Sequence, residues 1–133
     1  MDLTTGLGQA LDSYLNLKHD NVFSDQEYNQ ELRPDALLLQ AYPLDPKFKN
    51  SKFWSIATDG LGRKISDGFK MKWHQIGPGK VQLRLPVGLL SDAYLCESYV
   101  KTDPKIEKRK MAIFKVHLQL IRQGQFTECG RLS

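Results

Sequence analysis

The sequence predicts an α+β fold: two short N-terminal helices followed by a five- or six-stranded antiparallel β meander. A meander of this length can form a curved sheet or a half-barrel. Residues 69–85 alternate apolar and polar side chains with period two, which is typical of strands that bury one face. Apolar residues at helical spacing before Ser24 indicate one helix, and a helix-capping signal at Ser24 indicates a second. Both helices precede the strands. The meander follows from the series of strand-like runs after residue 52, which turn signals separate.

The length and composition are those of one globular domain, with 133 residues, 41% hydrophobic and 26% charged. We divide it into a helical acidic segment (1–34), the meander (35–122) and a polar tail (123–133) that we expect to be loosely held. The N-terminus has no secretory pattern, and no apolar run has the length of a membrane span. Two cysteines, Cys96 and Cys129, are too few for a disulfide scaffold. We therefore expect a cytoplasmic protein with no membrane partner.

The first helix is expected over residues 3–18 and the second from residue 25 to about residue 32. Ser24 and Glu27 form a capping box, and Phe23 and Tyr28 take the positions of a hydrophobic staple. The second helix should stop before Pro34, since a residue that precedes proline disfavours helical geometry. In the first helix the apolar face comprises Leu7, Leu11, Tyr14 and Leu15.

The run 35–42 can form either a buried strand or a helix with Pro34 in its first turn, and periodicity alone does not decide. We favour the strand. A loop is expected over 43–52, and a strand over 53–58 ends in the turn 59–62, after which 63–66 pair back.

Three further segments complete the predicted meander. The hairpin 69–85, preceded by a turn or bulge at Asp67-Gly68, reverses at Gly77-Pro78-Gly79. Residues 93–101 carry large side chains on both faces, which favours a central strand that Asp103-Pro104 breaks. A last strand is expected over 114–120, where apolar and polar residues again alternate.

The charge is distributed unevenly along the chain. Residues 1–50 hold four basic and eight acidic residues, and the remainder holds fifteen basic and seven acidic ones, so the net charges are −4 and +8. This asymmetry predicts a distinct basic surface, and the basic loop expected at 105–110 would extend it. If the predicted strands share one sheet, its polar face carries Lys70, Lys72, His74, Arg84, Lys115 and His117.

A basic face of this kind attracts phosphate backbones without reading sequence, so a nucleic acid is the expected partner. The expected contacts are Lys70, Lys72, Arg84, Lys105, Lys108, Arg109, Lys110 and Lys115. Lysines on outer strand positions also protect sheet edges, which is the ordinary alternative. Aromatic stacking residues are scarce on this face, with Trp54 and Tyr99 as the only candidates for exposure.

Other sites have weaker support. His74, His117 and Glu97 are residue types that bind metals, but no sequence spacing joins them. The turn 59–62 lacks the ending of a phosphate-binding loop, and Cys96 has no local base. Aromatics, among them Trp54, Trp73, Tyr94 and Tyr99, could line a pocket but more simply fill the core.

We therefore expect a non-enzymatic binding domain with no metal, cofactor or catalytic site. A protein–protein adaptor or accessory subunit is the alternative, in which the acidic N-terminal helices dock on a partner or on the basic face of a second copy. A small-molecule binder in a curved sheet is the third hypothesis.

Overall fold

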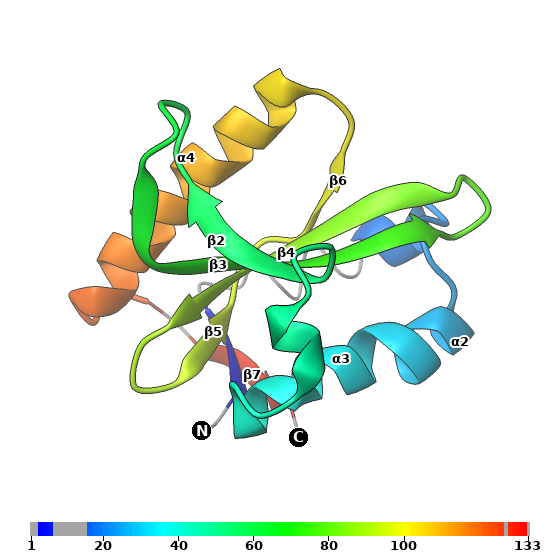
Figure 1. The fold of residues 1–133 in the computed structure, drawn as a ribbon, viewed down its shortest axis with the longest axis horizontal. Coiled ribbons are helices and arrows are strands. Elements are labelled where there is room, and N and C mark those ends of the chain that lie inside the picture. Colours follow the sequence, from blue (N-terminus) through cyan, green and yellow to red (C-terminus); the bar gives the residue numbers. More distant parts are fainter. Residues whose placement is uncertain (1–2, 7–15, 127, 133) are drawn as a thin grey trace.

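The computed structural model describes residues 3–6, 16–126 and 128–132 and shows an α+β fold built on one open sheet (Figure 1). The strand order is β2-β3-β4-β5-β1-β7, and β6 pairs with the far end of β4. Pairing is antiparallel except between β1 and β5. The α+β class and a mainly antiparallel sheet are confirmed, the sequential part of the sheet is limited to β2–β5, and the sheet is not closed. The strands described are β1 (Leu3–Gly6), β2 (Trp54–Thr58), β3 (Lys64–Ile76), β4 (Val81–Leu89), β5 (Ala93–Leu95), β6 (Tyr99–Lys101) and β7 (Glu128–Leu132).

Both ends of the chain differ from the sequence prediction. The helix expected over 3–18 is wrong at its start, because Leu3–Gly6 forms β1 between β5 and β7. Residues 16–19 are helical, and residues 7–15 lie outside the described part of the chain. The tail expected to be loose contains β7, which pairs with β1. Backbone pairing between the two termini decided both outcomes, and such long-range pairing leaves no local sequence signal.

The second helical region begins as predicted. Ser24 accepts a hydrogen bond from the Glu27 backbone N–H at 3.1 Å, and the Glu27 carboxylate accepts one from the Ser24 N–H at 3.0 Å. The Phe23 and Tyr28 rings stack with their centroids 6.4 Å apart. The capping box and the hydrophobic staple are therefore confirmed.

The helical region does not stop before Pro34. It continues through α2 (Asp25–Glu27), η1 (Tyr28–Leu32), α3 (Arg33–Leu37) and η2 (Leu38–Ala41). The η1 segment is a π-helical turn in which the Arg33 N–H donates to the Tyr28 carbonyl, and this wider turn admits the proline into the helix. The strand favoured for 35–42 is wrong. The buried apolar residues of this helical region follow helical spacing and pack on the sheet: Leu32, Ala36 and Leu39.

The predicted hairpin forms, and β2, β3 and β4 pair in sequence as antiparallel strands. Met71 lies opposite Leu85, Trp73 opposite Leu83 and Lys72 opposite Arg84. The signal at Asp67-Gly68 marks a bulge inside β3, where Asp67 has φ 61°, and the chain does not reverse there. Residues 93–101 form two strands, β5 and β6, and β5 lies centrally between β4 and β1. The loop 43–52 also contains a short 3₁₀ helix, η3 (Pro46–Lys49).

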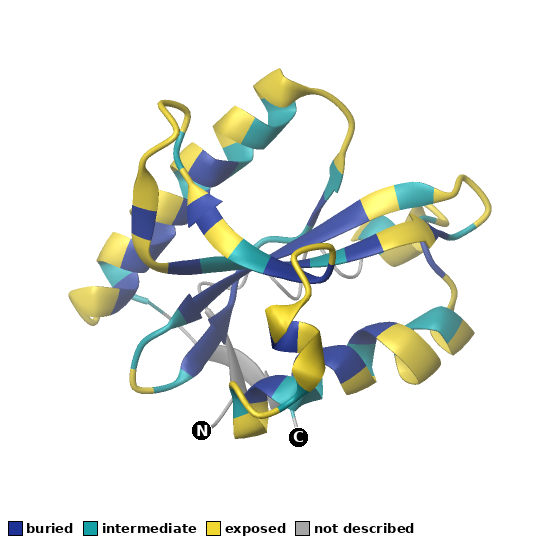
Figure 2. Cartoon of the chain, in the orientation of Figure 1, coloured by how far each residue is buried: buried dark blue, intermediate teal, exposed yellow. Residues whose placement is uncertain are grey.

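The largest correction is the helix α4 (Pro104–Arg122), which replaces the predicted basic loop 105–110 and the predicted strand 114–120. Asp103 caps it by accepting from the Ile106 N–H at 2.9 Å, and Pro104 takes the first helical position. Its buried side chains follow helical spacing, whereas Val116, which a strand would bury, is 58% exposed. Figure 2 shows α4 buried toward the sheet and exposed outward. The buried apolar residues are Met111, Phe114, Leu118 and Ile121.

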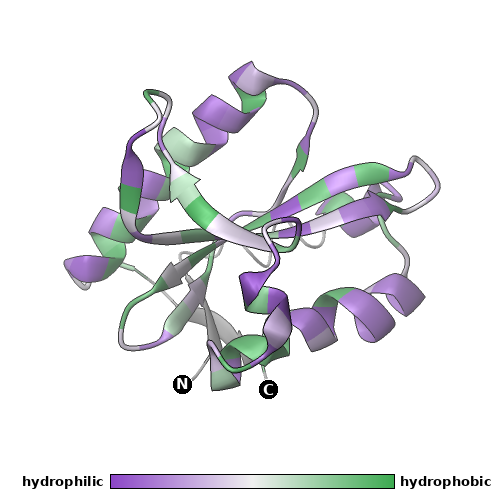
Figure 3. Ribbon diagram, in the orientation of Figure 1, coloured by the Kyte–Doolittle hydropathy of each residue, from purple (hydrophilic) through white to green (hydrophobic). Residues whose placement is uncertain are grey.

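The sheet separates two apolar clusters. On one face Met71, Trp73 and Leu85 pack against the helices of residues 25–41. On the other face Tyr94 and Tyr99 pack against the buried side of α4. Figure 3 shows the alternation of hydrophilic and hydrophobic residues along β3 and β4 that supplies the first face. Lys70, Lys72 and Arg84 alternate with the residues of the first face, so they lie on the side that α4 approaches, where Lys70 reaches Glu107.

Candidate functional site

Lys70, Lys72 and Arg84 lie on one face of the sheet, as their alternation predicts. The register places Lys72 opposite Arg84, and Arg84 opposite Tyr99 of β6. His74 follows Lys72 on the same side of β3 by alternation. Lys115 and His117 are not on this face, because both belong to α4.

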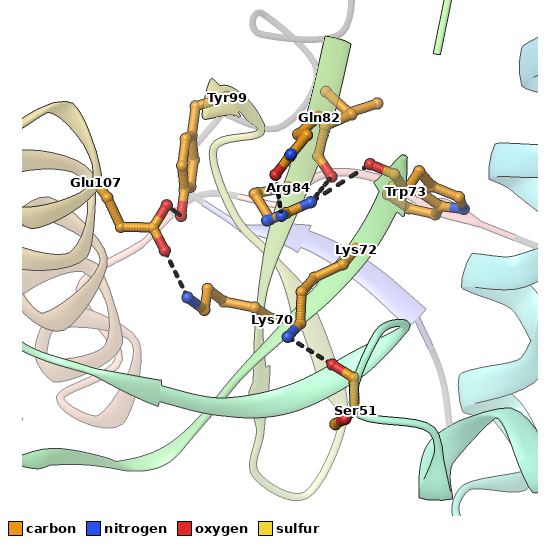
Figure 4. Close-up of polar contacts among 9 residues, drawn as sticks. Ser51, Lys70, Lys72, Trp73, Gln82, Arg84, Tyr99 and Glu107 are labelled. Atoms are coloured by element: carbon orange, nitrogen blue, oxygen red, sulfur yellow. Dashed lines mark hydrogen bonds and ion pairs between the residues drawn. The ribbon is translucent and has the colours of Figure 1, made fainter. Parts of the chain in front are cut away.

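This face is partly covered by α4 and its charges are partly compensated. Lys70 donates to Glu107 of α4 at 2.6 Å, with side-chain exposures of 14% and 17%. The Tyr99 hydroxyl donates to the other Glu107 oxygen at 2.9 Å. Figure 4 shows Glu107 and Tyr99 facing the basic side chains of β3 and β4. The open basic sheet surface that the sequence predicts is therefore wrong around Lys70.

Arg84 is buried, with 3% of the residue exposed. Its Nη1 donates to the carbonyls of Trp73 and Leu83 at 3.3 and 3.2 Å, and its Nη2 donates to the Gln82 side-chain oxygen at 2.8 Å. Lys72 donates to the Ser51 carbonyl at 2.7 Å. Each of these acceptors is neutral, so the positive charges of Arg84 and Lys72 are solvated by dipoles (Figure 4).

The electrostatic environment is asymmetric. Burial lowers the pKa of Lys72, and the neighbouring charges of Lys70, Arg84 and Lys101 lower it further. Burial also lowers the pKa of Arg84, against the opposing effect of Glu107. For Glu107, burial alone would raise the pKa, but the hydrogen bonds and charge of Lys70, with the Tyr99 hydroxyl, bring it below its ordinary value. The four cations Lys70, Lys72, Arg84 and Lys101, together with the Glu107 carboxylate, therefore give this face of the sheet excess positive charge.

The predicted contact residues that lie on α4 divide into two groups. Lys110 pairs with Glu97 at 2.7 Å, and Lys115 approaches Asp59 at 3.6 Å. Lys105, Lys108 and Arg109 are exposed, and within the part of the chain that the structure describes they form no ion pair. The predicted contact residues therefore do not form one surface. They form a buried or half-buried set on the sheet, a set on α4 that approaches carboxylates, and an exposed set on α4 without ion pairs among the described residues.

Sequence reasoning missed Lys101 and the acidic partners. Lys101 ends β6, is exposed, and lies across from Gln82 on the polar face. Glu107 and Glu97 lie 37 and 13 residues from the lysines that they bind. The helical period of α4 is the one signal that could have placed Glu107 toward the sheet, since Glu107 shares the face of Met111 and Phe114.

The candidate metal set is not assembled. The His74 Nε2 lies 2.7 Å from the Lys52 carbonyl, while His117 is buried in α4. Among residues 3–6, 16–126 and 128–132, no group of three or more His, Cys, Asp or Glu residues is placed to hold a metal ion. Burial raises the pKa of the Cys96 thiol to about 12, which removes the thiolate that a nucleophile requires.

The remaining candidates are structural. In the turn 59–62 the Asp59 carboxylate accepts from the backbone N–H groups of Leu61 and Arg63, at 2.8 and 3.0 Å. The four aromatics considered as a pocket lining are all buried in the two clusters: Trp54, Trp73, Tyr94 and Tyr99. Burial of Trp54 and Tyr99 also overturns their assignment as possible exposed stacking residues.

No helix in the described part of the chain is both long and apolar enough to cross a membrane. The chain matches no protein-family model, no curated protein and no solved structure. Function is therefore inferred from the geometry and charge of the two basic sets.

Proposed function

We propose that this chain binds nucleic acid through the phosphate backbone, using the outward surface of the N-terminal half of α4. The observation that supports this proposal is the spacing of Lys105, Lys108 and Arg109, which we call the α4 basic row. Lys108 and Arg109 lie three and four positions after Lys105, so each shares a helix face with Lys105, and all three are exposed. They present three cations to solvent along about one helical turn.

The α4 basic row does not stabilise α4. Like charges at this spacing destabilise a helix by about 0.2–0.5 kcal/mol per pair. Cations in the first turns also oppose the helix dipole, which favours acidic residues there. A role in binding an anion accounts for the arrangement, because an anion would relieve both effects.

The surroundings of the row favour contact with phosphates. Lys101 lies just before α4 and is exposed, and Lys115 lies farther along the helix with its side chain 55% exposed. The acidic residues of this region point elsewhere, since Glu107 faces the sheet and Asp103 caps the helix. Trp54 and Tyr99 are buried and cannot stack on bases. We therefore expect binding that depends strongly on salt and little on base sequence.

Fluorescence anisotropy with labelled single- and double-stranded oligonucleotides, titrated between 50 and 200 mM KCl, tests the proposal. Each phosphate contact contributes a slope of about 0.9 in log affinity against log salt for duplex DNA. Replacing Lys105, Lys108 and Arg109 together by Gln should therefore reduce the slope by about three. Lys110 is left in place because its loss would expose the charge of Glu97.

The matched control replaces three exposed lysines on other elements by Gln: Lys49, Lys52 and Lys80. It lowers the net charge by the same amount and should leave the slope nearly unchanged. Equal losses in both triple variants would reduce the effect to net charge and remove the row as a site. Affinity that does not respond to salt, or no binding at 50 mM KCl, would remove the nucleic-acid proposal itself.

A protein partner is the second candidate, favoured by two exposed apolar residues beside the row. Val116 continues the outward face of α4 and is 58% exposed, and Leu61 is 77% exposed in the turn whose Asp59 approaches Lys115. Light scattering tests self-association through this surface. A dimer that Val116→Ser dissociates would favour the adaptor function.

A further inference from the structure

The sheet face beneath α4 places like charges directly opposite one another. Lys72 of β3 and Arg84 of β4 are cross-strand partners, and such pairs hold their Cβ atoms about 4.5–5.5 Å apart. Lys101 of β6 lies on the same side, two residues beyond Tyr99, which is the partner of Arg84. Like charges that face one another across strands destabilise a sheet.

Within the described residues, the acidic side chains do not balance these charges. Glu107 is the carboxylate that reaches the face, and it already accepts from Lys70 at 2.6 Å and from Tyr99 at 2.9 Å. The groups that accept hydrogen bonds from Arg84 and Lys72 are neutral backbone carbonyls and the Gln82 amide oxygen. The set of Lys70, Lys72, Arg84, Lys101 and Glu107 therefore carries a formal charge of +3, with four cations and one carboxylate.

Donors for an anion are available on this face. A lysine ammonium carries three N–H donors, and Lys72 uses one of them on the Ser51 carbonyl. Lys72 is half-buried and Lys101 is exposed, so both can be reached from solvent. Arg84 is buried behind them with its Nη atoms engaged, and it supplies positive potential without direct contact.

The charge of the set selects among anions. A phosphodiester carries one negative charge, whereas a terminal or free phosphate has a second pKa near 6 and is mostly doubly ionised at neutral pH. We propose that Lys72 and Lys101, backed by Arg84, form a site for a doubly ionised phosphate group, which we call the inner phosphate site. The phosphate can come from the end of a nucleic-acid strand or from a small phosphate. The first source rests on the proposed function, and the site itself does not.

The test titrates inorganic phosphate into the full chain at pH 7.5, with chloride adjusted to keep the ionic strength constant. We expect saturable NMR shifts of the backbone amides around residues 72 and 101. Lys72→Met and Lys101→Met should each weaken phosphate binding by about tenfold, the effect of losing one charge-assisted contact. Lys80→Met is the matched control, since Lys80 lies in the turn between β3 and β4, and it should change the affinity less than twofold, or about 0.4 kcal/mol.

Each variant is first checked for its unfolding midpoint. Lys72→Met removes one of two opposed like charges, so it should fold, and Lys101→Met changes an exposed side chain. Phosphate that acts no differently from chloride would overturn the inner phosphate site. The same conclusion follows if all three variants bind phosphate as the unmodified chain does.

A second arm separates the two sources of phosphate. A 5′-phosphorylated oligonucleotide should bind more tightly than its 5′-hydroxyl form, and Lys72→Met should abolish the difference. Phosphate binding without this preference would support the site with a small phosphate as its ligand. If the unmodified chain binds inorganic phosphate but shows no salt-dependent binding of oligonucleotides, the proposed function is overturned and the inner phosphate site is not.

Discussion

Gly68 of β3 and Gly88 of β4 stand opposite one another, and their lack of side chains lets α4 pack on the sheet. A Cβ atom at Gly88 would lie 2.3 Å from the Cδ2 atom of Leu118, and one at Gly68 would lie 3.0 Å from the Phe114 ring. Leu118 is fully buried, so its side chain has little room to move. The glycine pair therefore sets how closely α4 approaches.

Gly88→Ala should lower the free energy of unfolding by about 1–3 kcal/mol, because the added methyl group overpacks a filled core. Urea denaturation measures this loss. Gly60→Ala is the control, since a Cβ there would meet its nearest neighbour, the Lys108 side chain, at an ordinary 3.7 Å. Equal stability of the two variants would contradict the close packing of α4.

Glu107→Gln should destabilise the fold by about 2 kcal/mol, because it leaves Lys70 without its carboxylate on a face that is already positive. The pKa of Glu107 lies below its ordinary value of 4.5, so its contribution is fully present above pH 4.5 and is lost as pH falls through the folded pKa. The difference in stability between the unmodified chain and Glu107→Gln should therefore shrink below pH 4.5. Glu31→Gln, at an exposed position, provides the control for removing a carboxylate.

His117 should make the stability of the fold depend on pH around its ordinary pKa of 6.5, well above the range in which Glu107 acts. Burial lowers its pKa below the ordinary 6.5, against the opposing effect of Glu97, and its Nδ1 has no hydrogen-bond partner within the described residues. The unfolded chain therefore binds the proton first, and stability falls as pH drops from above 6.5 toward the folded pKa. His117→Leu should remove this loss in thermal melts between pH 7.5 and 5.5, and the exposed His74→Gln should retain it. A pH dependence unchanged by His117→Leu would rule out this origin.

Asp35 connects α3 to the sheet and should respond differently to two substitutions. Its carboxylate accepts from the Trp73 Nε1 at 2.9 Å and from Lys47 at 2.7 Å. Asp35→Ala leaves the buried Trp73 N–H without its acceptor and should cost about 1–3 kcal/mol. Asp35→Asn keeps an acceptor oxygen and should retain most of the stability. Tryptophan fluorescence during denaturation reports both, and equal losses would show that the ion pair with Lys47 dominates.

Local signals predicted the parts of the fold whose determinants lie close together in the sequence. Ser24 and Glu27 are three residues apart, and their capping box forms as expected. The hairpin forms because apolar and polar residues alternate on both sides of Gly77, which adopts φ 71° in the turn. A bulge between Trp73 and Ile76 shifts the register of β3 just before this turn. These interactions depend on backbone geometry within a few residues.

The prediction of a strand over residues 114–120 is wrong because two periods fit the same residues. Phe114, Val116 and Leu118 satisfy a strand, but Met111, Phe114 and Leu118 satisfy a helix equally well. Asp103 and Pro104, which we interpreted as a strand break, are the cap and first residue of α4. The neighbouring glycines of the sheet favour the helix, since they make room for it.

Alternation along the strands was enough to place Lys70, Lys72 and Arg84 on one face, and the order of residues showed that positive charge is concentrated after residue 50. Which of these charges has a carboxylate partner followed from tertiary packing. Packing of α4 brings Glu107 to Lys70 and, with the β5–β6 connection, Glu97 to Lys110, while Lys105, Lys108 and Arg109 stay in solvent. Alternation along a strand is a local property of the backbone, whereas compensation of charge depends on side chains that meet through packing.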